Sequence, residues 1–166
     1  MSINFDDLLV GFYPTCTDKI GELKTFNDFV RDVKCPMDDD LKAARMFGLK
    51  YARCEDETEK ERLKDEYGKK KKQLPLWTPC HKAADRSQEA EAVPNGLITL
   101  DIDGLKPEDC EKVKEALKTV PYVCFACISI SGAGVVAYIN STPNVLSKAE
   151  AVEECWRLIC EYVSIK

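Results

Sequence analysis

Alternating apolar and polar positions make residues 96–105 the clearest strand in the sequence. The stretch reads GLITLDIDGL, and the Pro-Asn-Gly that introduces it is typical of a turn. Successive side chains of a strand point to opposite faces, so this strand has one aliphatic and one polar face. The two sets are Ile98, Leu100 and Ile102, and Thr99, Asp101 and Asp103. We expect the first set to pack in a core and the second, with its two carboxylates, to lie on a more open face.

The pattern after this strand predicts a helix, a hairpin of two strands and a second helix. Apolar residues recur at helical spacing behind Pro107, and a Ser-Gly-Ala-Gly turn separates two apolar runs. A capping box at Ser147 opens the second helix. The predicted bounds are 107–119, 122–130, 135–139 and 147–162. This β-α-β-β-α order predicts an α+β protein with a ferredoxin-like or RRM-like core, and the last strand of such a unit would lie beyond Lys166.

The first half of the chain has helical patterns behind a single predicted strand. Thr25 is a suitable N-cap for the first helix, and the prolines at 75 and 79 favour extended or turn geometry. The expected elements are a strand within 3–15, helices over 25–33, 38–51 and 55–72, an extended segment over 74–80 and a loop over 81–93. We therefore divide one compact domain into an N-terminal strand with a helical elaboration, residues 1–93, and a core, residues 94–166.

Composition and charge exclude several classes of protein. The net charge of −5 argues against a surface that is basic throughout, although a local basic patch remains compatible with it. No apolar run has the length of a membrane span, so we expect no membrane partner. The start of the chain lacks the features of a secretory signal, and the nine cysteines have no framework spacing. We expect free thiols in a cytoplasmic protein, and no structural zinc at Cys80-His81, because further ligands at metal spacing are missing.

Three features carry candidate chemistry, each with a plainer alternative. Asp101 and Asp103 repel each other unless a cation lies between them, and Mg²⁺ or Mn²⁺ prefers such oxygen ligands; the alternative is a turn that ends the strand. The run Lys69, Lys70, Lys71 and Lys72 is either a phosphate-contacting patch or a solvated helix end. Trp77 either stacks on a base or packs in the interior.

Two short motifs resemble the archaeo-eukaryotic primase-polymerase superfamily, and more closely the N-terminal primase-like domain of virulence-associated E (VirE-type) proteins of mobile elements. They are GLITLDIDGL at 96–105 and ISISGAGVVAYI at 128–139, and KKKKQLPLWTPC at 69–80 is similar to a further segment of that domain. The resemblance implies a primase-type core whose Asp101 and Asp103 bind the metal ions of two-metal phosphoryl transfer. It also implies that a serine-glycine turn lies near nucleotide phosphates; its residues here are Ser129, Ser131, Gly132 and Gly134.

The resemblance also implies a function in DNA replication, with single-stranded nucleic acid or nucleotide as partner and a helicase-type ATPase domain in the full-length protein. Two departures bear on catalysis. Val136 stands where active relatives have a histidine and VirE-type relatives often a basic residue, and the third acidic group would lie on the final strand. We therefore expect a nucleic-acid or nucleotide-binding domain that is catalytically degenerate or incomplete as this chain.

Two other functions remain open from the sequence. One is a non-catalytic docking module on the same fold, which need not bind a metal at the aspartates. The other is a phosphatase of the haloacid-dehalogenase type, because an Asp-x-Asp-Gly after an apolar strand also resembles the nucleophile loop of that family. In that case Asp101 would be the nucleophile and Asp103 the acid-base, although Leu105 replaces the usual threonine and no matching acidic pair is evident later in the chain.

Overall fold

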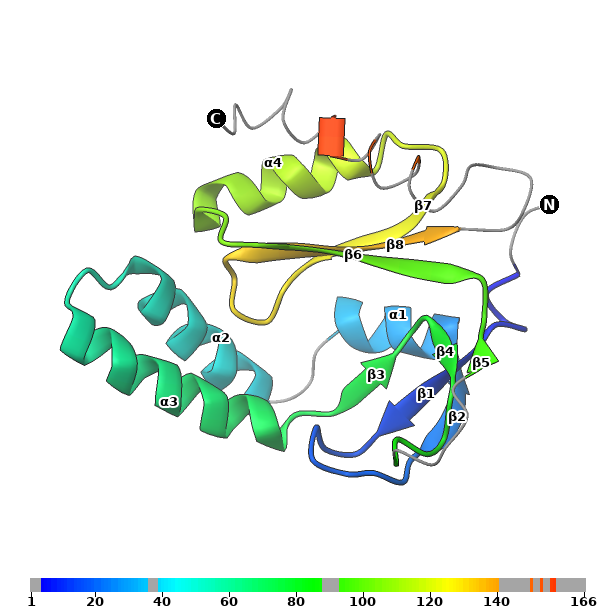
Figure 1. Cartoon of the computed structure of the whole chain (residues 1–166), viewed down its shortest axis with the longest axis horizontal. Helices are drawn as coiled ribbons and strands as arrows, with labels where there is room; N and C mark the ends of the chain where they lie inside the picture. Colours follow the sequence, from blue (N-terminus) through cyan, green and yellow to red (C-terminus); the bar gives the residue numbers. More distant parts are fainter. Residues whose placement is uncertain are drawn as a thin grey trace.

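A computed structural model describes residues 4–35, 39–87 and 93–140, together with Glu150, Glu153, Trp156 and Arg157. The described residues form a mixed α+β protein with helices and antiparallel sheets (Figure 1). In chain order the elements are β1 (Leu9–Tyr13), β2 (Glu22–Thr25), α1 (Phe26–Lys34), α2 (Asp39–Arg53), α3 (Glu57–Gln73), β3 (Leu76–Thr78), β4 (His81–Lys82), β5 (Val93–Pro94), β6 (Leu97–Asp103), α4 (Pro107–Leu117), β7 (Val123–Ile128) and β8 (Gly134–Asn140).

The central sheet has the strand order β6-β8-β7, and every neighbouring pair is antiparallel. β7 and β8 form the predicted hairpin, and the return strand β8 lies between β7 and β6. Helix α4 connects β6 to β7 and covers one face of the sheet (Figure 1). The strands predicted around residues 96–105, 122–130 and 135–139 and the helix predicted over 107–119 are therefore confirmed.

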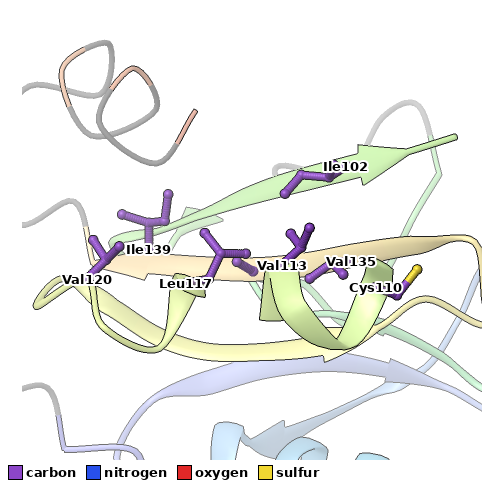
Figure 2. Close-up of a cluster of buried hydrophobic side chains, with 8 residues drawn as sticks. Ile102, Cys110, Val113, Leu117, Val120, Val135 and Ile139 are labelled. Carbon is purple, nitrogen blue, oxygen red and sulfur yellow. The ribbon is translucent and has the colours of Figure 1, made fainter. Parts of the chain in front are cut away.

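The aliphatic face of β6 packs beneath α4, as its alternation predicts. Ile102 is buried, and Ile98 and Leu100 pack against the same cluster, whereas Asp101 is exposed. Figure 2 shows helix and strand side chains meeting in this layer. The buried members of the cluster are Ile102, Cys110, Val113, Leu117, Val120, Val135, Ala137 and Ile139. Burial of branched aliphatic side chains at about 1.5–3 kcal/mol each is a major source of stability for this half of the protein.

The opposite face of the sheet is the more open one at Thr99, Asp101 and Asp103, as expected, and it is covered elsewhere. Aromatic rings of α1 pack against it: the centroid of Phe29 lies 5.3 Å from that of Tyr138 and 5.7 Å from that of Phe125. Leu97 at the start of β6 is buried in the same cluster. The exposed residues of this face of β6 are Thr99, Asp101 and Asp103.

The N-terminal half contains more strands than the sequence predicted. β1 is the central strand of a three-stranded antiparallel sheet, β2-β1-β3, in place of a single N-terminal strand. The proline-bounded segment is extended, as expected, and it forms β3. Two further short strands, β4 and β5, pair at the ends of the segment that we expected to be a loop. Strands of two to four residues carry little local signal, because distant pairing partners stabilise them.

The three N-terminal helices are confirmed. Thr25 caps α1, with its hydroxyl accepting from the Asp28 N–H at 3.1 Å and the Asp28 carboxylate accepting from the Thr25 N–H at 3.1 Å. Helices α2 and α3 pack side by side as a hairpin below the sheet (Figure 1). The helix expected over 147–162 lies mostly outside the described residues, and the four described positions within it are helical. Among the helices that the structure describes, none is long and apolar enough to cross a membrane.

Candidate functional site

The open end of the central sheet brings Asp103 next to the serine-glycine turn. Asp103 lies opposite Gly134 in the β6–β8 register. The Asp103 Oδ1 and the Ser129 Oγ are each 3.1 Å from the point where a Cβ on Gly134 would stand, and that Cβ would approach the Ile102 carbonyl oxygen to 2.6 Å. Only glycine fits there. The absence of a side chain at this position lets a carboxylate and a hydroxyl from different strands face a common space.

The two aspartates form a centre of negative charge that Lys71 compensates only in part. Asp101 and Asp103 are both exposed and lie two positions apart on β6. Partial burial raises the pKa of Asp101, the neighbouring Asp103 raises it further, and Lys71 opposes the shift. A raised pKa means that the charged form of Asp101 is disfavoured in the folded protein. The pair therefore favours binding of a cation, which would relieve this repulsion.

Helix α3 supplies an aromatic ring and a lysine beside the aspartates. Tyr67 and Lys71 are four residues apart, so they share one face of the helix. The Lys71 Nζ lies 5.9 Å from the centroid of the Tyr67 ring. Burial raises the pKa of Tyr67, with a further rise from Asp103 and a decrease from Arg45. These interactions connect α3 electrostatically with both aspartates and with α2.

Helix α2 holds the serine-glycine turn in place. The Arg45 guanidinium donates to the carbonyl oxygens of Ile128 at 3.3 Å and Ser129 at 3.0 Å. Gly48 contacts the turn so closely that a Cβ there would lie 2.6 Å from the Ser131 Cα. Gly132 has φ +76°, a conformation that favours glycine, and Leu49 fills the space beside it. The turn is fixed from both sides, by the sheet and by α2.

The two serines of the turn hydrogen-bond to each other. The Ser129 and Ser131 hydroxyl oxygens are 2.9 Å apart, and the Ala133 N–H donates to the Ser131 hydroxyl at 3.3 Å. Both serines are partly buried. Their mutual hydrogen bond leaves further acceptor capacity on the hydroxyl oxygens toward the space that Asp103 borders. The predicted nucleotide-binding residues thus lie beside the predicted metal-binding residues.

The lysine run divides into residues with different surroundings. Lys69 pairs with Glu66 at 2.8 Å, and Lys70 pairs with Asp40 at 3.0 Å. Lys71 acts on Asp101, whereas Lys72 is exposed at the end of α3. The solvated-helix interpretation therefore suits Lys69 and Lys70, and Lys71 belongs to the candidate site. Sequence spacing gave no reason to single out Lys71, because that distinction depends on how α3 docks below the sheet.

Trp77 packs inside the aromatic cluster. Its ring centroid is 4.7 Å from that of Phe12 and 5.7 Å from that of Phe29, and the Lys24 ammonium lies 5.7 Å from it. The indole is partly buried in this cluster. These contacts favour the interior-packing alternative over base stacking, because a base would have to displace aromatic neighbours.

Among the described residues, the side chains at this site that could bind a metal ion are the carboxylates of Asp101 and Asp103. No group of three or more histidine, cysteine, aspartate or glutamate side chains that could hold a metal occurs among them. Cys127 lies on the neighbouring strand, but burial raises the pKa of its thiol to about 11, so it is a neutral thiol at pH 7. Val136, opposite Asp101 on β8, is apolar. The pair fits a hard divalent cation that takes its remaining ligands from water or substrate phosphate.

Sequence reasoning missed two residues of this site, Tyr67 and Arg45. Tyr67 was recognisable only as part of a thin apolar stripe on a charged helix, and Arg45 as one charge on an amphipathic helix. A cation-aromatic pair at i and i+4, such as Tyr67 and Lys71, is a weak signal on its own. The pair becomes part of the candidate site because the fold places this face of α3 near the two aspartates.

The described residues thus define a mixed α+β protein in which two aspartates, a lysine, a tyrosine and a serine-glycine turn gather at one end of an antiparallel sheet. The chain belongs to the family of BT4734-like N-terminal domains: the sequence model of that family matches residues 69–164, more than half of the chain. The matched stretch contains all the site residues that the sequence predicted. Comparisons with curated proteins and with solved structures give no match.

Proposed function

We propose that this chain is a primase-like domain of a mobile-element replication protein that binds nucleotide or single-stranded nucleic acid and is catalytically incomplete by itself. The observation that carries the proposal is the convergence at Asp101 and Asp103. Lys71 on α3 acts on Asp101, and the serine-glycine turn borders Asp103. Carboxylates for a cation, a lysine for phosphate and a glycine-rich turn are the groups that phosphate recognition requires.

The strand order supports a ferredoxin-like, primase-type core for this proposal. In such a unit the first and second strands are parallel and separated, and the third strand returns between them. The order β6-β8-β7, with antiparallel neighbours and α4 as the crossover, agrees with that arrangement. The VirE-type resemblance remains part of the proposal, and so do DNA replication, the helicase-type ATPase partner and cytoplasmic localisation.

In this proposal Asp101 and Asp103 would hold Mg²⁺ or Mn²⁺, which would supply charge stabilisation for bound phosphates. The hydroxyls of Ser129 and Ser131 and the backbone of Gly132 and Gly134 border the same space and would orient a nucleotide. Lys71 would bind a phosphate oxygen. Each residue acts in binding, and none of these functions requires a completed reaction.

Two features of the surroundings of the aspartates support the proposed catalytic incompleteness. Phosphoryl transfer depends on positioning and on stabilising charge, so each missing ligand costs a large part of the rate. Val136 lies opposite Asp101 and has neither a charge nor a side-chain hydrogen bond to offer. Among the described residues, no third acidic side chain completes the pair into a metal-binding group.

The test is binding of a fluorescent nucleoside triphosphate to the whole chain as Mn²⁺ is titrated, with NMR line broadening as a second readout. We expect weak Mn²⁺ binding, roughly millimolar without nucleotide, because few-ligand oxygen sites depend on substrate phosphates. The double variant Asp101→Asn, Asp103→Asn should lose the Mn²⁺-dependent binding. Lys71→Ala should weaken nucleotide binding.

The matched control for Lys71→Ala is Lys69→Ala, which removes the same charge from the same helix end. Lys69 pairs with Glu66 and lies outside the candidate site, so its removal should leave nucleotide binding close to wild type. Equal losses in the two variants would indicate a diffuse charge effect. Binding of nucleotide that is independent of both Mn²⁺ and the aspartates would refute the proposal.

The docking-module alternative does not require Mn²⁺ to bind at Asp101 and Asp103, so the same titration distinguishes it from the proposal. The phosphatase alternative needs a further acidic pair, and none accompanies the two aspartates in the described part of the chain. No observation favours either alternative over nucleotide binding.

A further inference from the structure

A groove of about 510 Å³ runs along the outer edge of β7, on the side of the sheet away from β6. Residues 124–128 of β7 form its floor. Its walls come from the end of α1, from α2 and from α4. We call it the β7 groove; the wall residues are Val33, Lys34, Arg45, Lys114 and Lys118.

The β7 groove is strongly basic in a protein that is acidic overall. Four cationic side chains from α1, α2, α4 and the C-cap of α4 line it, and no aspartate or glutamate is among the lining residues that the structure describes. The whole chain has a net charge of −5, so this concentration of positive charge is a local feature. A cleft lined by one sign of charge raises the local concentration of ions of the opposite sign. The groove therefore favours an anionic ligand.

Two of the cations can exchange their present partners for a ligand. Lys114 in α4 and Lys118 at its C-cap lie four residues apart, and both form ion pairs with Glu115; Lys114 also pairs with Glu111. Both glutamate side chains are more than half exposed to solvent. Exposed ion pairs contribute only about 0–1 kcal/mol each, so a phosphate in the groove can compete for these lysines.

The floor of the groove adds backbone donors. In the described residues, β7 has a strand neighbour on one side only. The Ser129 N–H donates to the Gly134 carbonyl at 2.9 Å, toward β8. Since N–H directions alternate along a strand, the N–H groups of Ile128 and Ala126 point outward into the groove. Backbone N–H groups are common partners of phosphate oxygens in nucleic-acid complexes.

The groove adjoins the candidate site. Cys127 on its floor lies opposite Val136, and Val136 lies opposite Asp101, so two strand spacings, roughly 10 Å, separate them. Arg45 lines the groove and also holds the Ser129 carbonyl of the serine-glycine turn. A flexible polymer with one negative charge per monomer can therefore bind in the β7 groove and reach the candidate site at the same time.

We propose that the β7 groove binds the phosphodiester backbone of a nucleic-acid single strand whose end lies at Asp101 and Asp103. This inference rests on the proposed function, because the adjoining nucleotide site gives the strand its direction. An acidic protein segment would also meet the positive charge. The continuity of the groove with the serine-glycine turn favours the strand.

The test measures binding of fluorescent oligo(dT), about twelve nucleotides long, to the whole chain at several salt concentrations. The double variant Lys114→Ala, Lys118→Ala should bind at least tenfold more weakly at low salt. Its log–log salt slope should fall by about 1.4, since each phosphate contact on a single strand contributes about 0.7. The matched control is Lys112→Ala on the same helix; Lys112 pairs with Asp109 at 2.9 Å and does not line the groove.

The outcomes separate this proposal from the function on which it rests. The Lys114/Lys118 variant should keep Mn²⁺-dependent nucleotide binding, and the Asp101/Asp103 variant should lose it while retaining most oligonucleotide affinity. Thermal melting checks that both variants fold. If the Lys114/Lys118 variant binds oligo(dT) as Lys112→Ala does, or if the wild type does not bind it at low salt, the groove proposal is wrong. Displacement of oligo(dT) by a glutamate-rich peptide of equal charge would overturn it in favour of an acidic protein partner.

Discussion

Substituting Gly48 by alanine tests whether the α2–α3 hairpin is seated on the serine-glycine turn. An alanine Cβ at this position would lie 2.6 Å from the Ser131 Cα and 2.8 Å from its carbonyl oxygen, well inside the ordinary contact of about 3.5–4.0 Å. The turn cannot simply withdraw, because Arg45 holds two of its carbonyls. The helix must shift by an appreciable part of an ångström, and with it the hairpin that carries Lys71.

The magnitude follows from two opposing terms. Alanine is more favourable than glycine inside a helix by about 1 kcal/mol. Overpacking against a fixed neighbour costs about 1–3 kcal/mol. Gly48→Ala should therefore lower the free energy of unfolding by about 0–2 kcal/mol. Gly68 in α3 is the matched control, because a Cβ there meets nothing within 4 Å; Gly68→Ala should raise the free energy of unfolding by about 1 kcal/mol.

Urea unfolding followed by circular dichroism measures both variants against the wild type. The two should differ by about 1–3 kcal/mol, or roughly 2–12 °C in Tm for a chain of this size. Gly48→Ala should also weaken Mn²⁺-dependent nucleotide binding, whereas Gly68→Ala should not. If Gly48→Ala is as stabilising as Gly68→Ala, then α2 does not pack on the turn in solution and the site geometry described above is wrong.

Four further predictions concern the site and the fold. Because the folded-state pKa of Asp101 is raised, the charged form of Asp101 destabilises the folded protein. Asp101→Asn should therefore stabilise the protein at pH 7, and this gain should vanish as the pH falls below the usual aspartate pKa. Urea unfolding at several pH values measures the gain. Lys71→Ala should raise the pKa of Asp101 further in an NMR titration of the carboxyl carbon, and an unchanged value would remove Lys71 from the site. Thr25→Ala should cost about 0.5–2 kcal/mol in urea unfolding through loss of the α1 cap, and a neutral result would contradict the capping box. Finally, the chain alone should synthesise no strand, with or without primer, in Mg²⁺ or Mn²⁺; product that vanishes in the double variant Asp101→Ala, Asp103→Ala would show the site to be complete.

Local sequence determined the elements with strong periodic patterns. The alternation along residues 96–105 fixed which side chains of β6 face the core, and Ile102 is buried while Asp101 is exposed. Thr25 and Asp28 set the start of α1 through hydrogen bonds within a single turn. These features depend on neighbours within a few residues, so a pattern along the chain contains the information that defines them.

Tertiary structure alone decided how the site is assembled. In the sequence, Lys71 could not be distinguished from the three lysines beside it. No pattern marked Arg45 or Tyr67 as residues of a site. Their places in the candidate site depend on the docking of α2 and α3, which Gly48 and the turn at 129–134 permit. The short strands β2 to β5 were missed for the same reason. Long-range strand pairing and packing bring together residues that are tens of positions apart in the sequence. A local periodic pattern therefore cannot predict which distant surface a helix face will pack against.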